Sequence, residues 1–298
     1  MNFNLSLALA ASLALTTTTL ATTALAVEPP NPPAAKAFQI GTLQAWSLHD
    51  ADFGILNDGK TFGADVGPVE VAKVLAAAAM PTDKIPVSID ALLIKTGDRL
   101  VLLDTGLGPF AANQLVASLK LAGFEPGQVT DILITHSHSD HVFGLTTQAK
   151  TLTFPNATVR MTSKEWDWMK SLAQNAAVTA LIASKVKTFE PGAELAPGIT
   201  AVALDGHTPG HSGFEVRSGT ARLLDVGDLV HSSVVSLAKP EWAMGFDSDK
   251  VLGKATRRAE LNALAKSGEL VFAPHFPFPG VGHIVAQGDG FVWKPGVE

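Results

Sequence analysis

The chain has 298 residues, of which 46% are hydrophobic and 17% charged, enough for one large globular domain or two small ones. A net charge of −6 and a pI near 5.8 argue against a nucleic-acid partner, which would require a basic surface. Because the chain contains no cysteine, disulfides, thiolate zinc sites and cysteine nucleophiles are excluded.

Residues 1–26 have the character of a secretory signal peptide. They carry no charged side chain and end in Ala24-Leu25-Ala26, a pattern that predicts cleavage after Ala26. A membrane anchor is the alternative, but a threonine run breaks the apolar stretch short of the ~20 residues that a spanning helix needs. Residues 27–37 then form a Pro-rich leader. We therefore predict an exported protein, periplasmic or secreted, with no stable membrane insertion after cleavage.

Residues 38–298 predict a single domain with mixed α and β layers. In the first half, apolar runs predict strands at 38–46, 87–94, 100–103 and 131–135. Helical patterns are expected at 69–80, 111–121 and 163–172, and less regularly from there to residue 188. Ser163 is the expected N-cap of the third helix, and residues 54–63 have the composition of a loop.

The second half has a β-rich character. Strands are expected at 199–204, 213–217, 221–226 and 270–273. A helix over 249–265 should end near Gly268, and a last hairpin over 284–293 should turn at 288–290.

A cluster of four candidate metal ligands follows the strand expected at 131–135. Residues 136–141 read His-Ser-His-Ser-Asp-His, and imidazole nitrogens and carboxylate oxygens are good ligands for zinc and similar divalent ions. The alternative, a solvated polar turn, would have to explain four such groups in one tight loop. We therefore interpret His136, His138, Asp140 and His141 as metal ligands.

Three further candidate ligands lie where later strands end: His207, Asp228 and His275. Seven ligands are too many for one tetrahedral ion, so the sequence predicts two divalent ions, each with room for a water molecule. Zinc is the expected metal, although manganese, iron and cobalt accept the same ligands. One ion would take His136, His138 and His207, the other would take Asp140, His141 and His275, and Asp228 would bridge the two ions.

The order of these motifs resembles that of the metallo-β-lactamase superfamily. The H-x-H-x-D-H cluster comes first, followed by the Gly-His-Thr-Pro-Gly-His segment at 206–211, then Asp228 and finally His275. The resemblance implies an α/β fold, a four-layer αβ/βα sandwich. It favours His207 over His211 as the ligand in the 206–211 segment. It also implies that Asp104, in Leu-Asp-Thr-Gly, orients the metal-binding loop from behind the ligands.

Residues 273–284, which contain the run Phe276-Pro-Phe-Pro-Gly280, resemble the methyl parathion hydrolase branch more closely, as do residues 227–229 and 246–249. This resemblance implies a secreted binuclear-metal hydrolase, a homodimer, that cleaves organophosphate triesters or related small-molecule esters. We expect a metal-bridging hydroxide as the nucleophile, with Asp140 and Asp228 as the catalytic carboxylates.

Two alternatives remain open. One is a lactonase or arylesterase of the same fold; related lactonases commonly use a pocket tyrosine, and this chain has no tyrosine. The other is a non-catalytic exported protein that binds a metal or another ligand. His231 either lines the pocket or packs, and the same two interpretations apply to several apolar side chains: Phe110, Trp166, Trp168, Met169, Phe276 and Phe278.

Overall fold

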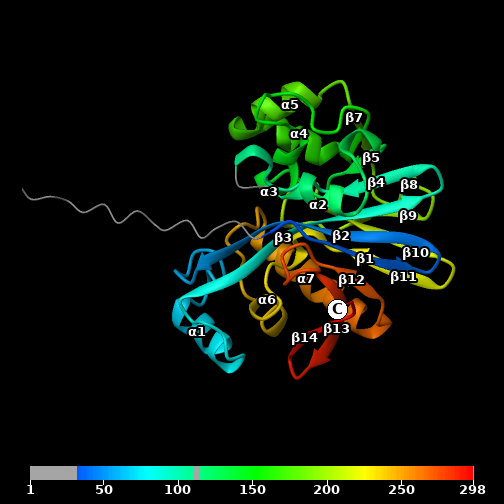
Figure 1. Cartoon of the computed structure of the whole chain (residues 1–298). Helices are drawn as coiled ribbons and strands as arrows, with labels where there is room; N and C mark the ends of the chain where they lie inside the picture. The colour runs from blue at the N-terminus through cyan, green and yellow to red at the C-terminus, as the bar shows by residue number, and fades with distance from the viewer. Residues whose placement is uncertain (1–31, 111–113, 298) are drawn as a thin grey trace, which may run out of the picture.

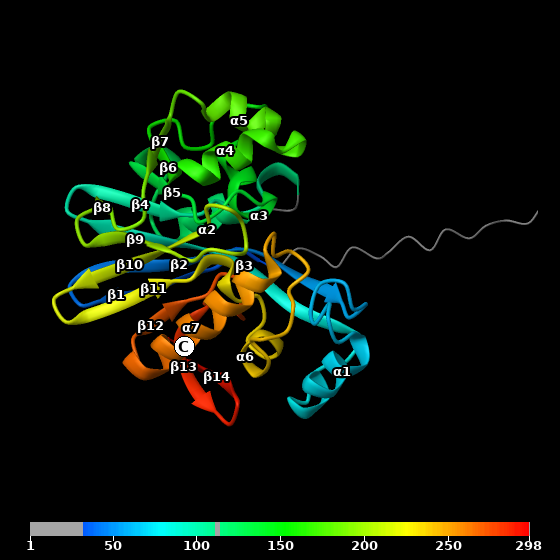
Figure 2. The same ribbon diagram turned by 180° about the vertical axis from the view of Figure 1, so that it is seen from behind.

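The structure is a computed structural model that describes residues 32–110 and 114–297, so the predicted signal peptide and the first part of the leader lie outside the described residues. Two seven-stranded sheets face each other, with α2–α5 on one outer side and α6 and α7 on the other (Figures 1 and 2). This arrangement confirms the predicted four-layer αβ/βα sandwich.

Each sheet is built from consecutive strands. The first contains β1 (Ala35–Ile40), β2 (Leu43–Leu56), β3 (Lys84–Thr96), β4 (Arg99–Leu103), β5 (Asp131–Leu133), β6 (Thr158–Thr162) and β7 (Val186–Phe189). The second contains β8 (Glu194–Ala196), β9 (Ile199–Ala203), β10 (Ser212–Ser218), β11 (Ala221–Asp225), β12 (Leu270–Phe272), β13 (Val281–Gln287) and β14 (Gly290–Pro295). The helices are α1 (Pro68–Ala77), α2 (Leu115–Leu121), α3 (Ser139–Val142), α4 (Ser163–Ser171), α5 (Ala176–Ile182), α6 (Val235–Ala238) and α7 (Lys250–Ser267).

Alternation along buried strands explains the layers. On β4, Leu100 and Leu102 pack with the cluster that includes side chains from α2, α4 and α5, whereas Val101 and Leu103 pack between the two sheets. Because successive side chains of a strand point to opposite faces, a continuous apolar run produces a strand that is buried on both sides.

Helix α7 covers the outer face of the second sheet. Asp249 caps its start, because its side chain accepts hydrogen bonds from the backbone N–H groups of Val251 and Leu252. The helix ends at Gly268, whose positive φ of 65° is the left-handed conformation that glycine adopts readily. Leu261 and Leu264 pack into the core cluster of this sheet.

Several boundaries differ from the sequence predictions. The strand expected at 38–46 is two strands that turn at Gly41, and β1 begins at Ala35, within the expected leader. Thr162, not Ser163, caps α4, because the Thr162 side chain accepts a hydrogen bond from Glu165 N. The stretch toward residue 188 contains α5 but ends in strand β7, and β6 and β8 were not predicted. The helix expected at 111–121 begins at Leu115, while residues 111–113 lie outside the description.

Among the described residues, none of the helices is both long enough and apolar enough to span a membrane. The loops that follow β5, β9, β11 and β12 meet at one edge of the sandwich, and they carry the predicted ligands.

Candidate metal centre

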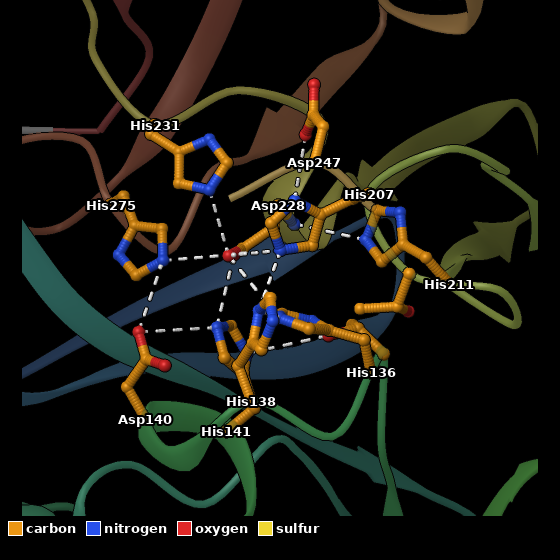
Figure 3. Close-up of polar contacts among 12 residues, drawn as sticks. His136, His138, Asp140, His141, His207, His211, Asp228, His231, Asp247 and His275 are labelled. Atoms are coloured by element: carbon orange, nitrogen blue, oxygen red, sulfur yellow. Dashed lines mark hydrogen bonds and ion pairs between the residues drawn. The ribbon is translucent and has the colours of Figure 1, made fainter. Parts of the chain in front are cut away.

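The first group of candidate ligands combines the loop after β5 with the loop after β9. His138 Nδ1 lies 2.9 Å from His136 Nε2 and 2.9 Å from His207 Nε2 (Figure 3). His136 and His207 are fully buried or nearly so. Three imidazole nitrogens therefore converge on one point, as expected for one predicted metal position.

The second group combines α3 with the loop after β12. Asp140 Oδ2 lies 3.6 Å from His141 Nε2 and 3.6 Å from His275 Nε2. Both imidazoles are buried, whereas 24% of the Asp140 side chain is exposed. Each group thus contains one partly exposed ligand, His138 in the first and Asp140 in the second, and both border the cavity described below.

Asp228, in the turn after β11, stands between the two groups (Figure 3). Its Oδ2 lies 3.1 Å from His207 Nε2, while its Oδ1 lies 3.1 Å from His141 Nε2 and 2.9 Å from His275 Nε2. One carboxylate thus presents one oxygen to each group, and the structure brings all seven predicted ligands together.

Asp104 holds the loop that carries the first four ligands. Its Oδ2 accepts hydrogen bonds from His141 Nδ1 at 2.7 Å and from Thr135 Oγ1 at 2.7 Å, and its Oδ1 accepts one from Thr135 N at 2.9 Å. Because the Nδ1 atom of His141 carries the proton, Nε2 presents a lone pair to the centre.

Two more histidines are oriented in the same way. Nδ1 of His207 donates to Asp247 Oδ1 at 3.0 Å, and Nδ1 of His275 donates to the Ser88 carbonyl at 2.8 Å. Asp247 also accepts a hydrogen bond from Arg257 Nη2 at 2.7 Å. Asp247 and Arg257 are both buried, so this support for His207 is rigid.

His211 and His231 lie beside the centre in different roles. Both ring nitrogens of His211 are engaged, one with the Leu204 carbonyl at 2.8 Å and the other with Asp228 N at 3.1 Å. Nε2 of His231 lies 3.0 Å from Asp228 Oδ2, and the ring stacks on His275 with a centroid distance of 5.4 Å. His231 therefore both packs and borders the site, which joins the two interpretations that the sequence left open.

The electrostatics differ between the two ligand groups of the centre. Burial lowers the pKa of His138 to about 4, so that its imidazole is neutral and its lone pair is free. Burial would also lower the pKa of His275, but Asp228 and Asp140 outweigh this effect and raise it to about 9. The two carboxylates thus attract a cation to the second group.

The donor set fits divalent metal ions. His141 Nε2 and Asp228 Oδ1 are buried atoms without a hydrogen-bond partner, and the nitrogens of the first group face one another. Buried acceptor atoms in such numbers are costly unless a cation satisfies them, and nitrogen and oxygen ligands of this kind are the set that zinc prefers.

A cavity of about 440 Å³ opens over the centre. Asp140, Asp228, His231 and His275 are among its lining residues. The rest of its wall is mostly apolar and includes Phe53, Ile55, Val87, Ile89, Leu107 and Phe246. It is within the range of volumes typical of small-molecule sites.

The apolar side chains whose roles the sequence left open lie in different places. Met169 and Phe276 are core residues with no exposed surface. Trp166 packs against the core, whereas the Trp168 ring contacts the His138 ring at 5.5 Å. Phe278 contacts His49 and does not border the cavity. The side chain of Phe110 lies outside the description.

Sequence reasoning missed Glu165 and Asp247 as supporting residues, and Phe53 and Phe246 as wall residues. Asp247 lies in residues 246–249, which resemble the methyl parathion hydrolase branch, and this resemblance is the signal that could have indicated it. Phe246 lies in the same segment, whereas Phe53 comes from the opposite half of the chain and lies in no recognisable motif.

Comparison with known proteins agrees with the fold and the centre. The family model of the metallo-beta-lactamase superfamily matches residues 85–275. The chain therefore belongs to the metallo-β-lactamase superfamily.

Two solved structures are similar over 89% of this chain and 98% of their own. One is AidC, a dizinc quorum-quenching lactonase in complex with the product N-hexnoyl-L-homoserine, with a TM-score of 0.84 and 29% identity. The other is the hydrolase AbOPH, with a TM-score of 0.80 and 28% identity. Among curated proteins, an N-acyl homoserine lactonase of Bacillus sp is 22% identical over 222 residues, which cover 65% of this chain and 84% of that protein.

Proposed function

We propose that this protein is a two-metal hydrolase that cleaves lactones and related carboxylic esters. The observation that carries the proposal is the placement of Asp228, which presents one oxygen to each of two buried ligand groups beneath an apolar-walled cavity. The similarity to AidC supports lactones as the substrate class.

His136, His138 and His207 would hold one divalent cation, Asp140, His141 and His275 the second, and Asp228 both. Zinc is the proposed metal, in line with the similarity to the dizinc AidC. When bound, such cations supply Lewis acidity that activates water near neutral pH and polarises an ester oxygen.

The chain's own polar groups would position the substrate and move the proton. Asp140 lines the cavity and is partly exposed, so its carboxylate would accept a proton from the attacking water. As the acyl C–O bond of the ring breaks, that proton passes to the departing oxygen, and the product is a hydroxy acid. Nε2 of His231 donates to Asp228 Oδ2 and fixes the orientation of that carboxylate.

The cavity wall would bind the apolar part of the substrate. Phe53, Ile55 and Phe246 offer surface for an acyl chain, and transfer of such a chain from water is favourable by about 0.8 kcal/mol per CH₂. Organophosphate triesters are the second candidate class, supported by the sequence resemblance of residues 273–284, since their aryl or alkyl groups suit the same wall.

A substrate panel on zinc-loaded protein tests this proposal. Acyl-homoserine lactones, aryl esters, phosphotriesters and β-lactams would be compared, with the bound metal counted per chain. We expect two metals and the highest kcat/KM on lactones. Faster turnover of phosphotriesters would reverse the order of the two candidates. Two bound metals without turnover of any ester would instead support a non-catalytic binding protein.

We also propose that the protein is exported, on the composition of residues 1–26. Expression of the full chain in a bacterium with N-terminal sequencing of the periplasmic protein tests this. The expected mature N-terminus is Val27, and an uncleaved cytoplasmic protein would contradict export.

A further inference from the structure

Glu165 is a fully buried carboxylate in the first turn of α4. Its Oε1 accepts hydrogen bonds from Ser137 N and Ser137 Oγ, both at 2.7 Å. Its Oε2 accepts hydrogen bonds from Thr208 Oγ1 at 2.6 Å and from Gly210 N at 3.1 Å. Four donors thus satisfy one buried side chain that contributes no atom to the metal centre.

The four donors belong to two different ligand loops. Ser137 lies between His136 and His138, and Thr208 follows His207 directly. Each oxygen of Glu165 therefore binds one loop, and the two loops together supply the three nitrogens that converge at 2.9 Å. We propose that Glu165 is a positioning residue that sets the spacing of His136 and His138 relative to His207 for the first metal ion, an inference that rests on the proposed two-metal function.

The N-terminal end of α4 reinforces this connection. Thr162 Oγ1 donates to the Gly210 carbonyl at 2.8 Å, while it accepts a hydrogen bond from Glu165 N. A Cβ atom on residue 210 would overlap the Glu165 backbone nitrogen, so only glycine permits this close packing. Further along, Asn175 Nδ2 donates to the Ser137 carbonyl at 2.9 Å. The helical segment thus holds Ser137 through its N–H, its hydroxyl and its carbonyl.

The chemistry of the contacts requires a carboxylate. An ionised Glu165 offers acceptor sites on both oxygens, whereas a glutamine of nearly the same size has one acceptor oxygen and an NH₂ group that only donates. In a Glu165→Gln variant the NH₂ group would face the donors of one loop. The hydroxyl of that loop can rotate and accept a hydrogen bond, but its backbone N–H can only donate, so the loop would lose this partner and shift. A residue that merely filled space would tolerate the same change.

The proposal is tested by measuring zinc affinity in competition with a chromophoric chelator. Three proteins are compared: wild type, Glu165→Gln and Glu190→Gln. Glu190 is a matched control, because it is exposed and its side chain accepts a hydrogen bond from Ser163 Oγ, at the start of the same helix, and not from a described residue of either ligand loop. We expect Glu165→Gln to lower the affinity for one of the two zinc ions by about 10- to 100-fold, while the affinity for the other changes much less. Glu190→Gln should bind both ions as wild type does.

The melting temperature provides a second measurement that separates positioning from general stability. Positioning predicts that the rise in Tm on adding zinc is reduced in Glu165→Gln, beyond any change in the metal-free Tm. A metal-free Tm that falls while both zinc affinities stay within about twofold of the control would overturn the proposal, and so would an equal loss at both sites.

If Glu165→Gln does not fold, the pair Ser137→Ala and Thr208→Val removes only the two hydroxyl donors. Combined, these substitutions should lower the affinity for the same zinc ion by a smaller factor. Unchanged zinc affinity would overturn the proposal. Because the measurements concern metal binding, they do not depend on ester cleavage. A wild type that binds two zinc ions but cleaves no ester would disprove the proposed function without affecting this inference.

Discussion

The metal centre and the apolar wall of the cavity above it are held by different means. At the centre, buried hydrogen bonds orient the imidazoles, as Asp104 does for His141 and Asp247 for His207. In the wall, the side chains of Phe53 and Phe246 are 44% and 49% exposed, and they border the cavity with apolar surface that makes no hydrogen bond. Directional bonds fix a geometry to tenths of an ångström, whereas apolar contacts tolerate rearrangement. We therefore expect the centre to determine the reaction and the wall to determine substrate preference.

The largest effect should follow from Asp228→Ala, which removes the carboxylate shared by both ligand groups. We expect loss of both metals and a fall in kcat/KM of at least about a thousandfold on every substrate, since three factors of ten correspond to about 4 kcal/mol. Kinetics with metal analysis provide the check, and Asp98→Ala in an exposed turn is the control. Full activity without Asp228 would refute the assignment of the centre.

A smaller effect, restricted to one metal position, is expected from Asp104→Asn. The amide cannot accept hydrogen bonds from both His141 and Thr135 with the geometry of the carboxylate. The affinity for zinc at the site formed by Asp140, His141 and His275 should fall by about 10- to 100-fold. A metal titration at controlled free zinc measures this affinity. Wild-type affinity at both positions would remove Asp104 from the orienting role.

Substitution in the wall should change selectivity without affecting the centre. Phe246→Ala removes half-exposed apolar surface, so we expect about 1 kcal/mol less binding of a long acyl chain. That loss corresponds to a roughly fivefold higher KM with little change in kcat. Lactones with four-carbon and ten-carbon acyl chains would be compared, and the short one serves as the internal control. An equal loss of kcat on both substrates would contradict the division between centre and wall.

The same division decides what the sequence could predict. Ligand chemistry is encoded in residue type, and ligands that each follow an apolar strand are recognisable from local patterns, as at His207 and His275. The alternating burial of β4 likewise follows from a local apolar run. Phe276 was ambiguous because its packing against Trp293 depends on a hairpin formed later in the chain.

Residues that act through long-range contacts gave no comparable local signal. Glu165 is the third residue of α4, and acidic residues are common there because they stabilise the N-terminus of a helix. Its contacts with Ser137 and Thr208 therefore could not be inferred from its position in the sequence. Phe53 reaches the cavity only because β2 runs on to Leu56, beyond the strand expected at 38–46. Tertiary structure, not local pattern, assigns these roles.

The smallest effect concerns a group outside both regions, and it separates acid unfolding from loss of the centre. Burial would raise the pKa of Glu215, but hydrogen bonds and charges from Arg217 and Arg222 outweigh it and lower the pKa below its usual value of 4.5. A lowered folded-state pKa stabilises the protein above the unfolded pKa, and this stabilisation is lost as pH falls through the folded value. Glu215→Gln should therefore lower Tm slightly at pH 7 and by less at pH 3, while neutral-pH activity is unchanged. Thermal melts across this range provide the measurement.

If activity at pH 5 falls equally in wild type and Glu215→Gln while Tm is retained, the loss originates in the metal centre and not in unfolding.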